Sequence, residues 1–135
     1  MRRLLALIAL SAAVPAVALA DGGAKNLIAT PAVKAALRAS FLKTHPDLAP
    51  AKVAGPIKGR TYYGSYHGKE YALATFSIPR FGTQDQPEIF TRPSGRAWKD
   101  LGDTGGDVCV PWVPLTLIKV WQLKSSGNAG CYYEP

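Results

Sequence analysis

Residues 57–78, with the sequence IKGRTYYGSYHGKEYALATFSI, decide the fold. Two runs rich in β-forming residues, Ile57 to Tyr66 and Lys69 to Ile78, flank the dipeptide His67-Gly68. Such runs around two turn-forming residues predict a β-hairpin. If the turn is tight, residues whose numbers sum to 135 lie opposite each other. A bulge at Gly68 would instead shift one strand against the other.

Alternation along this hairpin assigns its side chains to two faces. One face is predicted to be the core side and carries Ile57, Thr61, Tyr63, Ala72, Ala74, Phe76 and Ile78. The other face is predicted to meet solvent and carries Lys58, Arg60, Tyr62, Tyr66, Lys69, Tyr71, Leu73 and Thr75. An antiparallel sheet with one wet face commonly shows this division.

Upstream of the hairpin, the sequence predicts an amphipathic helix. Thr30-Pro31 fits an N-cap followed by proline at the first helical position, and Pro46 should end the helix near Thr44 or His45. One stripe at helical spacing comprises Val33, Ala36, Leu37, Ser40 and Phe41, and all of these except Ser40 are apolar. The segment from Asp21 to Ala29 is predicted to be a loose entry arm.

Downstream of the hairpin, Pro79 to Pro87 is predicted to be a polar loop. A second hairpin is expected from Glu88 to Arg92 and Arg96 to Leu101, around Pro93-Ser94-Gly95. The segment from Val113 to Lys124 fits a short helix, although its β-branched residues also permit a strand. The predicted fold class is therefore α+β, with an antiparallel sheet of about four strands packed on one face by an N-terminal helix and a short C-terminal helix.

The N-terminus has the pattern of a cleavable signal peptide, residues 1–20. Arg2-Arg3 precede an apolar stretch from Leu4 to Leu10, and Ala18-Leu19-Ala20 supplies the small residues that signal peptidase requires. The apolar run is shorter than the ~20 residues that cross a bilayer, so no membrane span is expected after cleavage. We therefore expect a secreted or envelope-associated protein that begins at Asp21, with residues 21–135 forming a single α+β domain.

Charge and cysteine content fit that compartment. Removal of two arginines with the signal peptide lowers the formal net charge from +7 to +5, which favours anionic surfaces such as cell-envelope polymers, lipid headgroups or extracellular nucleic acid. The sequence does not name the partner; the candidates are an anionic envelope polymer and a secreted protein. Cys109 and Cys131 are the only two cysteines. In an oxidising compartment, such a pair predicts a disulfide. The two cysteines flank the predicted C-terminal helix, so the bond would join the segments at its two ends.

Several short motifs resemble a group of small secreted actinobacterial proteins without an established activity. The resemblance is carried by Tyr62-Tyr63, Tyr71-Ala72-Leu73-Ala74-Thr75-Phe76, Gly105-Gly106, Cys109-Val110-Pro111 and the segment from Pro114 to Trp121. It covers most of the chain after the signal peptide. Because these motifs are structural, the resemblance implies a fold and no mechanism.

The sequence contains no recognisable catalytic set, metal-ligand cluster or cofactor-binding loop, so no cofactor is expected. The two cysteines lack the spacing of a metal site, and Gly105-Gly106 lacks the lysine of a phosphate loop. The alternative is a small secreted hydrolase of ribonuclease type. Such an enzyme needs a carboxylate base, a histidine acid and phosphate-binding arginines, and residues of these types are Glu70, His67, Arg60 and Arg80.

The first function predicted is therefore a secreted or envelope-associated binding module that is not an enzyme. Its binding residues are expected on the solvent-facing side of the first hairpin, at Arg60, Tyr62, Tyr66 and Tyr71 together with Lys58 and Lys69. Tyrosine and arginine are enriched in binding hot spots. The same residue types are also ordinary occupants of a wet sheet face.

Overall fold

The hairpin around His67-Gly68 is present in the computed structural model, which describes residues 23–135. Strands β2 (Thr61–Tyr66) and β3 (Lys69–Ala74) pair so that Tyr66 lies opposite Lys69. The tight-turn register is thereby confirmed, without a bulge at Gly68. His67 and Gly68 have φ values of 47° and 72°, and positive φ at both positions is what a two-residue type I′ turn requires.

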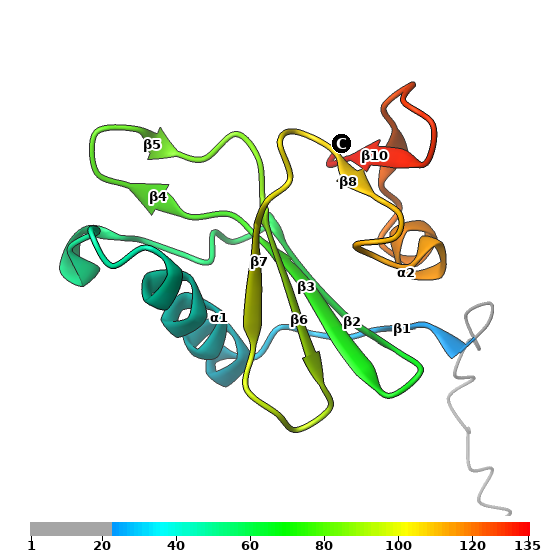
Figure 1. The fold of residues 1–135 in the computed structure, drawn as a ribbon, viewed down its shortest axis with the longest axis horizontal. Helices are drawn as coiled ribbons and strands as arrows, with labels where there is room; N and C mark the ends of the chain where they lie inside the picture. Colours follow the sequence, from blue (N-terminus) through cyan, green and yellow to red (C-terminus); the bar gives the residue numbers. More distant parts are fainter. Residues whose placement is uncertain (1–22) are drawn as a thin grey trace, which may run out of the picture.

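The hairpin is the centre of a five-stranded antiparallel sheet with the order β1-β2-β3-β6-β7 (Figure 1). Its remaining strands are β1 (Lys25–Asn26), β6 (Glu88–Pro93) and β7 (Lys99–Asp103). The α+β class and the second hairpin are confirmed. The sheet has one strand more than expected because β1 forms inside the segment predicted to be a loose arm. Two residues are too short to show a strand period.

Short strands complete the described part of the chain. The second strand of the first hairpin, predicted to reach Ile78, ends at Ala74. Ser77–Ile78 instead forms β4, which pairs as a narrow ribbon with β5 (Gly82–Thr83) from the predicted polar loop. A three-stranded sheet contains β8 (Val108–Cys109), β10 (Cys131–Tyr133) and β9 (Lys124–Ser125) in that order. A 3-10 turn, η2, spans Pro50–Lys52.

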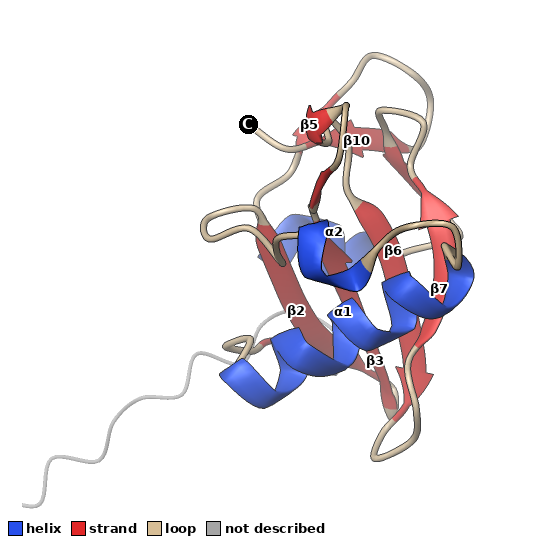
Figure 2. Cartoon of the chain, turned by 90° about the vertical axis from the view of Figure 1, so that its left-hand side faces the viewer, coloured by secondary structure: helices blue, strands red, loops and turns tan. Residues whose placement is uncertain are grey.

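Helix α1 (Pro31–Thr44) begins and ends where the sequence predicts. The Thr30 hydroxyl accepts a hydrogen bond from the Val33 amide at 3.3 Å, and the backbone leaves the helix at His45, just before Pro46. Figure 2 shows α1 crossing the strands on the side that faces the viewer. Its Leu37 and Phe41 side chains pack into a core that contains Tyr63, Ala72, Ala74, Phe76, Phe90 and Trp98.

Helix α2 (Leu115–Val120) packs on the other face of the sheet. The segment predicted from Val113 to Lys124 is therefore helical in its middle, and Lys124 belongs to strand β9. In Figure 1, α1 and α2 lie on opposite sides of the strands. Leu117, Ile118 and Trp121 form a second core with Leu73, Ile89, Val108 and Val113. The prediction that both helices pack on one face is therefore wrong. Hydrophobic stripes show that a helix is amphipathic and do not show which face of the sheet it covers.

The prediction that one face of the first hairpin meets solvent is also wrong. Leu73 and Thr75 are 0% exposed, and the rings of Tyr62, Tyr66 and Tyr71 are half-buried against the core around α2. Lys58 and Lys69 alone of the eight residues assigned to this face are exposed. Tyrosine and threonine suit a solvent-exposed face and a buried face equally well. Alternation along the strands therefore could not show that α2 packs on this face.

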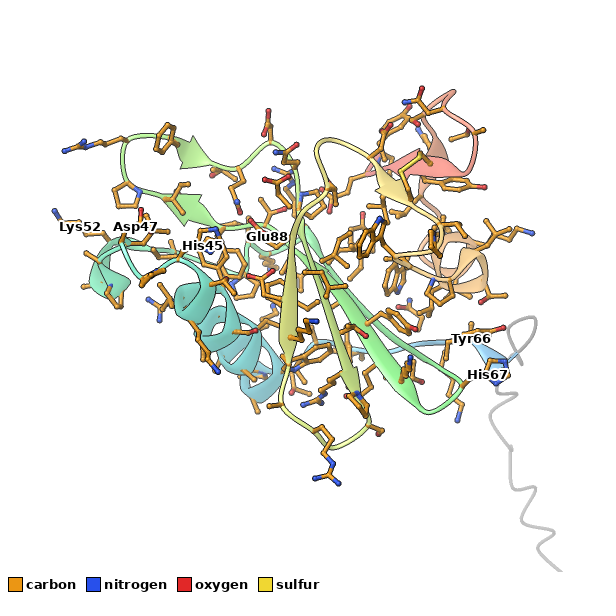
Figure 3. All side chains as sticks on the ribbon, viewed as in Figure 1. His45, Asp47, Lys52, Tyr66, His67 and Glu88 are labelled. Carbon is orange, nitrogen blue, oxygen red and sulfur yellow. A yellow bond between two sulfur atoms is a disulfide. The ribbon has the colours of Figure 1, made fainter. Side chains whose placement is uncertain are left out.

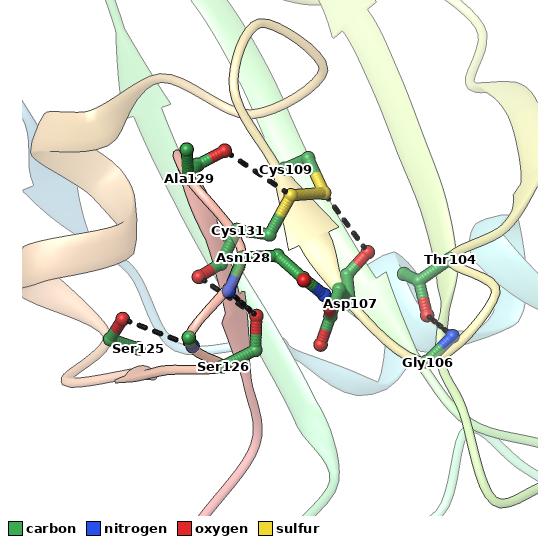
Figure 4. Close-up of a disulfide and its surroundings, with 10 residues drawn as sticks. Thr104, Gly106, Asp107, Cys109, Ser125, Ser126, Asn128, Ala129 and Cys131 are labelled. Atoms are coloured by element: carbon green, nitrogen blue, oxygen red, sulfur yellow. Dashed lines mark hydrogen bonds between the residues drawn. A yellow bond between two sulfur atoms is a disulfide. The ribbon is translucent and has the colours of Figure 1, made fainter.

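The predicted disulfide is confirmed: Cys109 and Cys131 are bonded and lie opposite each other on β8 and β10 (Figure 4). The bond joins two paired strands and closes the segment that contains α2. No helix in the described part of the chain is long and apolar enough to cross a membrane. The predicted signal peptide, residues 1–20, lies outside the described residues.

Candidate functional site

Arg60, the first of the predicted binding residues, is used inside the fold. Its Nη2 lies 3.1 Å from Oε2 of Glu134, and its Nη1 and Nη2 donate to the carbonyl oxygens of Gln84 at 2.8 Å and Asp85 at 2.9 Å. The guanidinium thus joins the chain beyond β10 to the segment that follows β5. Because these contacts use the guanidinium nitrogens, Arg60 stabilises the fold by linking these two segments.

The three predicted tyrosines contribute rings to the α2 side of the sheet. Tyr62 packs on Trp121 with ring centroids 5.9 Å apart. Burial raises the pKa of the Tyr62 hydroxyl, and the Glu134 carboxylate adds to the shift. Burial likewise raises the pKa of Tyr71, with a smaller contribution from Tyr66. Both hydroxyls therefore stay protonated at neutral pH.

The residues named for a ribonuclease-type site lie in separate parts of the fold. Glu70 pairs with Arg92 and accepts a hydrogen bond from the Tyr63 hydroxyl at 2.9 Å, on the α1 side of the sheet. His67 stands at the hairpin tip against the ring of Tyr66 (Figure 3). Arg60 is held by Glu134. Arg80 belongs to the exposed turn between β4 and β5.

A buried carboxyl at Glu88 lies at the end of the sheet near His45 (Figure 3). Its Oε1 accepts a hydrogen bond from Nε2 of Gln84 at 2.9 Å, and its Oε2 has no partner among the described residues. Burial raises the pKa of Glu88, and Asp100 raises it further against the Gln84 hydrogen bond. The amide of Phe76 donates to Gln84 at 3.0 Å. Glu88 therefore supports the base of the β4–β5 ribbon from inside the core.

A groove beside Trp112 presents apolar surface and polar groups together. It has a volume of about 210 Å³ and is lined by Ile89, Leu101, Asp103, Thr104, Asp107, Cys109 and Trp112. Helix α2 contacts β1 and β2. On the sheet face that α2 covers, β6 and β7 are bordered by the connection between β8 and α2, which contains Trp112. The groove therefore lies on the α2 side of the sheet, toward its β7 edge.

Trp112 supplies the exposed aromatic surface of this groove. Its side chain is 59% exposed, whereas Trp98 and Trp121 are only 9% and 5% exposed. Val110 in the same connection and Leu115 at the start of α2 are also exposed, at 43% and 38%. Monomeric proteins leave few contiguous apolar patches in water, and such patches commonly mark binding sites.

Two carboxylates on the groove are held by hydrogen bonds from neighbouring loop residues. Asp103 Oδ1 accepts a hydrogen bond from the Gly105 amide at 2.9 Å, and Asp107 Oδ2 accepts one from Asn128 Nδ2 at 2.8 Å. Figure 4 shows Asp107 and Asn128 beside the disulfide. The second oxygen of each carboxylate has no hydrogen-bond partner among residues 23–135. The groove thus combines an aromatic surface with hydrogen-bond acceptors and has no basic lining residue.

Sequence reasoning did not identify Trp112, although the chain carries a local signal for it. The tryptophan stands between Pro111 and Pro114, and prolines favour an extended or turning chain over a helix. Two of the predicted binding residues, Tyr66 and Tyr71, lie on the same sheet face as the groove. The register places Tyr71 opposite Thr91 and Leu73 opposite Ile89, so Tyr71 and Ile89 are diagonal neighbours on that face.

Comparison with known proteins supplies no relative whose function could be considered for this chain. No protein-family model, curated protein or solved structure matches it. Among residues 23–135 there is also no group of three or more side chains placed to hold a metal ion. The groove is therefore interpreted through its own chemistry.

Proposed function

We propose that the protein is an exported, non-catalytic binding module that holds its ligand in the Trp112 groove. The observation that carries this proposal is the exposure of the Trp112 indole beside a groove with fixed acceptors. A tryptophan ring offers a large contact area with few rotatable bonds, and for this reason tryptophan is enriched in binding hot spots. Burying such a ring on binding releases hydrophobic free energy that the free protein does not gain.

Export is supported by two independent features. The N-terminal pattern fits a cleavable signal peptide. The Cys109–Cys131 disulfide fits a protein that matures in an oxidising compartment, since disulfides are rare in the cytosol. We infer from both that the protein works outside the cytoplasm, in the cell envelope or beyond it.

The charge of the exported chain supports an envelope polymer as its partner. Without the two arginines of the signal peptide, the formal net charge is +5, which would attract polyanionic cell-wall material over several ångströms. A secreted protein is the other partner that this charge permits. The groove would add a short-range contact that depends on shape and chemistry.

The experiment is cosedimentation of the purified exported form, residues 21–135, with isolated bacterial cell walls. We expect Trp112→Ala to weaken binding at least about tenfold, which corresponds to about 1.4 kcal/mol. Phe81→Ala is the matched control, because Phe81 is also an exposed aromatic, at 79%, and lies on the β4–β5 turn outside the groove. Full binding by the Trp112 variant would reject the groove. Turnover of cell walls, RNA or casein by the purified protein would reject the non-catalytic assignment.

A further inference from the structure

We propose that the groove recognises a primary ammonium group on a peptide branch of an envelope polymer. This inference rests on the proposed function and specifies the chemistry of its ligand. It follows from the joint presence of one exposed indole, two carboxylates and one hydroxyl around a small groove.

The size of the groove favours one side-chain-sized group. Its volume of about 210 Å³ is below the ~300 Å³ at which sites for whole drug-sized ligands begin. The floor contains Ile89, which is 5% exposed, and half-buried Leu101. Such a surface can contact the methylene groups of a lysine-like side chain, whose charged end would lie among the polar groups of the rim.

The charge of the lining selects a cation over an anion. Asp103 and Asp107 both line the groove, and no lysine or arginine does. A carboxylate or phosphate placed there would meet two like charges, whereas an ammonium would meet two opposite ones. The face of an indole also attracts a cation, by about 0.5–2 kcal/mol depending on desolvation.

The number of acceptors also matches an ammonium. A primary ammonium has three N–H donors and no acceptor. The three polar side chains that line the groove are those of Asp103, Thr104 and Asp107. The Thr104 hydroxyl accepts a hydrogen bond from the Gly106 amide at 3.2 Å and retains a second lone pair. Because loop hydrogen bonds already hold all three side chains, little conformational freedom remains to be lost on binding.

The positive net charge of the exported chain and its acidic groove fit one zwitterionic partner. A polymer with a polyanionic backbone would be attracted by the chain as a whole. An amine on a peptide branch of the same polymer would enter the groove. The positive net charge of the chain alone would not distinguish this polymer from a simple polyanion. The acidic groove alone would not distinguish it from a free polyamine.

The test uses Nα-acetyl-lysine methylamide as the ammonium probe and its Nε-acetylated form as the uncharged control. Binding is measured by protection of tryptophan fluorescence from acrylamide. Since Trp98 and Trp121 are buried, the quencher reports mainly on Trp112. We expect the ammonium probe to protect Trp112 and the acetylated probe to bind at least tenfold more weakly.

Matched variants assign the effect to the carboxylates. The double variant Asp103→Asn/Asp107→Asn keeps an oxygen acceptor for each loop hydrogen bond and removes both charges. We expect it to lose at least tenfold in affinity for the ammonium probe, whereas Asp85→Asn, at an exposed carboxylate outside the groove, keeps full affinity. Thermal unfolding of each variant checks that the fold is intact.

The outcomes separate this inference from the proposed function. Equal binding of both probes, or full affinity of the double variant, would overturn the ammonium assignment. Protection of Trp112 by a neutral N-acetylglucosamine oligomer and not by the amine would overturn it as well. In each of these cases, loss of cell-wall binding by Trp112→Ala would leave the proposed function standing.

Discussion

Gly64 shows how closely the second core approaches the sheet. A Cβ built on Gly64 would lie 2.7 Å from Cδ2 of Leu117 and 2.7 Å from the carbonyl oxygen of Lys25. Glycine thus lets α2 and β1 lie against β2 at this point. Its backbone φ is not in the left-handed region, so the requirement is for space alone.

We therefore expect Gly64→Ala to destabilise the protein by about 1–3 kcal/mol, as overpacked cores do. Ser65→Ala, at the neighbouring position, should change stability by less than about 0.5 kcal/mol. Urea unfolding of both variants measures the difference. Equal stability of the two variants would mean that α2 does not pack on this strand.

Glu88 should make stability depend on pH. Burial raises the pKa of its carboxyl in the folded protein, so this group contributes stability at low pH that is lost as the pH rises through the folded value. Glu88→Gln cannot ionise and can still accept the hydrogen bond from Gln84. We expect the variant to gain stability relative to the wild type as the pH is raised from about 4 toward 8.

Urea unfolding across that pH range measures the difference between the Glu88 variant and the wild type. Asp47→Asn, at an exposed carboxylate, serves as the control. A flat difference for Glu88→Gln would contradict the burial assigned to this carboxyl.

For single residues, the sequence predicted the sheet face correctly but not the burial or the contacts of the side chains. Tyr62, Tyr66 and Tyr71 were correctly placed on one hairpin face, because strand alternation is a local property. Their burial depends on α2 and β8, which are about forty to fifty positions away in the chain. The ion pair of Arg60 could not be predicted either, because only the fold brings Glu134 beside it.

The disulfide ties β8, which borders the groove through Cys109, to the neighbouring strand β10. It joins β8 to β10 across a separation of 22 residues, and closing such a loop stabilises a fold by ~3 kcal/mol in the chain-entropy model. We expect Cys109→Ser/Cys131→Ser to lose about 2–4 kcal/mol on urea unfolding, and to bind cell walls more weakly because Cys109 lines the groove. Unchanged stability would contradict this role.

Arg60 links the chain beyond β10 to the segment after β5, and its removal leaves Glu134 without an ion-pair partner. We expect Arg60→Ala to destabilise the protein by about 1–3 kcal/mol. Lys58→Ala is the matched control, since Lys58 is an exposed cation close by in the chain, and it should be neutral. Loss of cell-wall binding by Arg60→Ala with full stability would instead restore Arg60 as a binding residue.

Elements with strong local signals were predicted well. The turn chemistry of His67-Gly68 specified the hairpin register, and Thr30-Pro31 and Pro46 specified the ends of α1. The two-residue strands β1 and β5 were not predicted, and the residues of β4 were predicted to extend the first hairpin. Each of these strands exists through pairing with a partner that local sequence does not identify.

The molecule as a whole is a sheet covered on both faces, and this layering creates the groove. Helix α1 covers one face, and α2 with the disulfide-linked strands covers part of the other. Trp112 stands where that second cover reaches β6 and β7. The fold class could be predicted from sequence, but the groove could not, because it combines side chains from three strands and two loops.

The measurement that tests the central claim most directly is NMR chemical-shift mapping of ¹⁵N-labelled protein comprising residues 21–135 with soluble fragments released from bacterial cell walls. Binding in the groove predicts that the largest shifts occur at Ile89, at residues 101–107, and at the indole N–H of Trp112. Shifts confined to the β4–β5 turn or to the exposed lysines of the first hairpin, with the Trp112 indole unchanged, would contradict it.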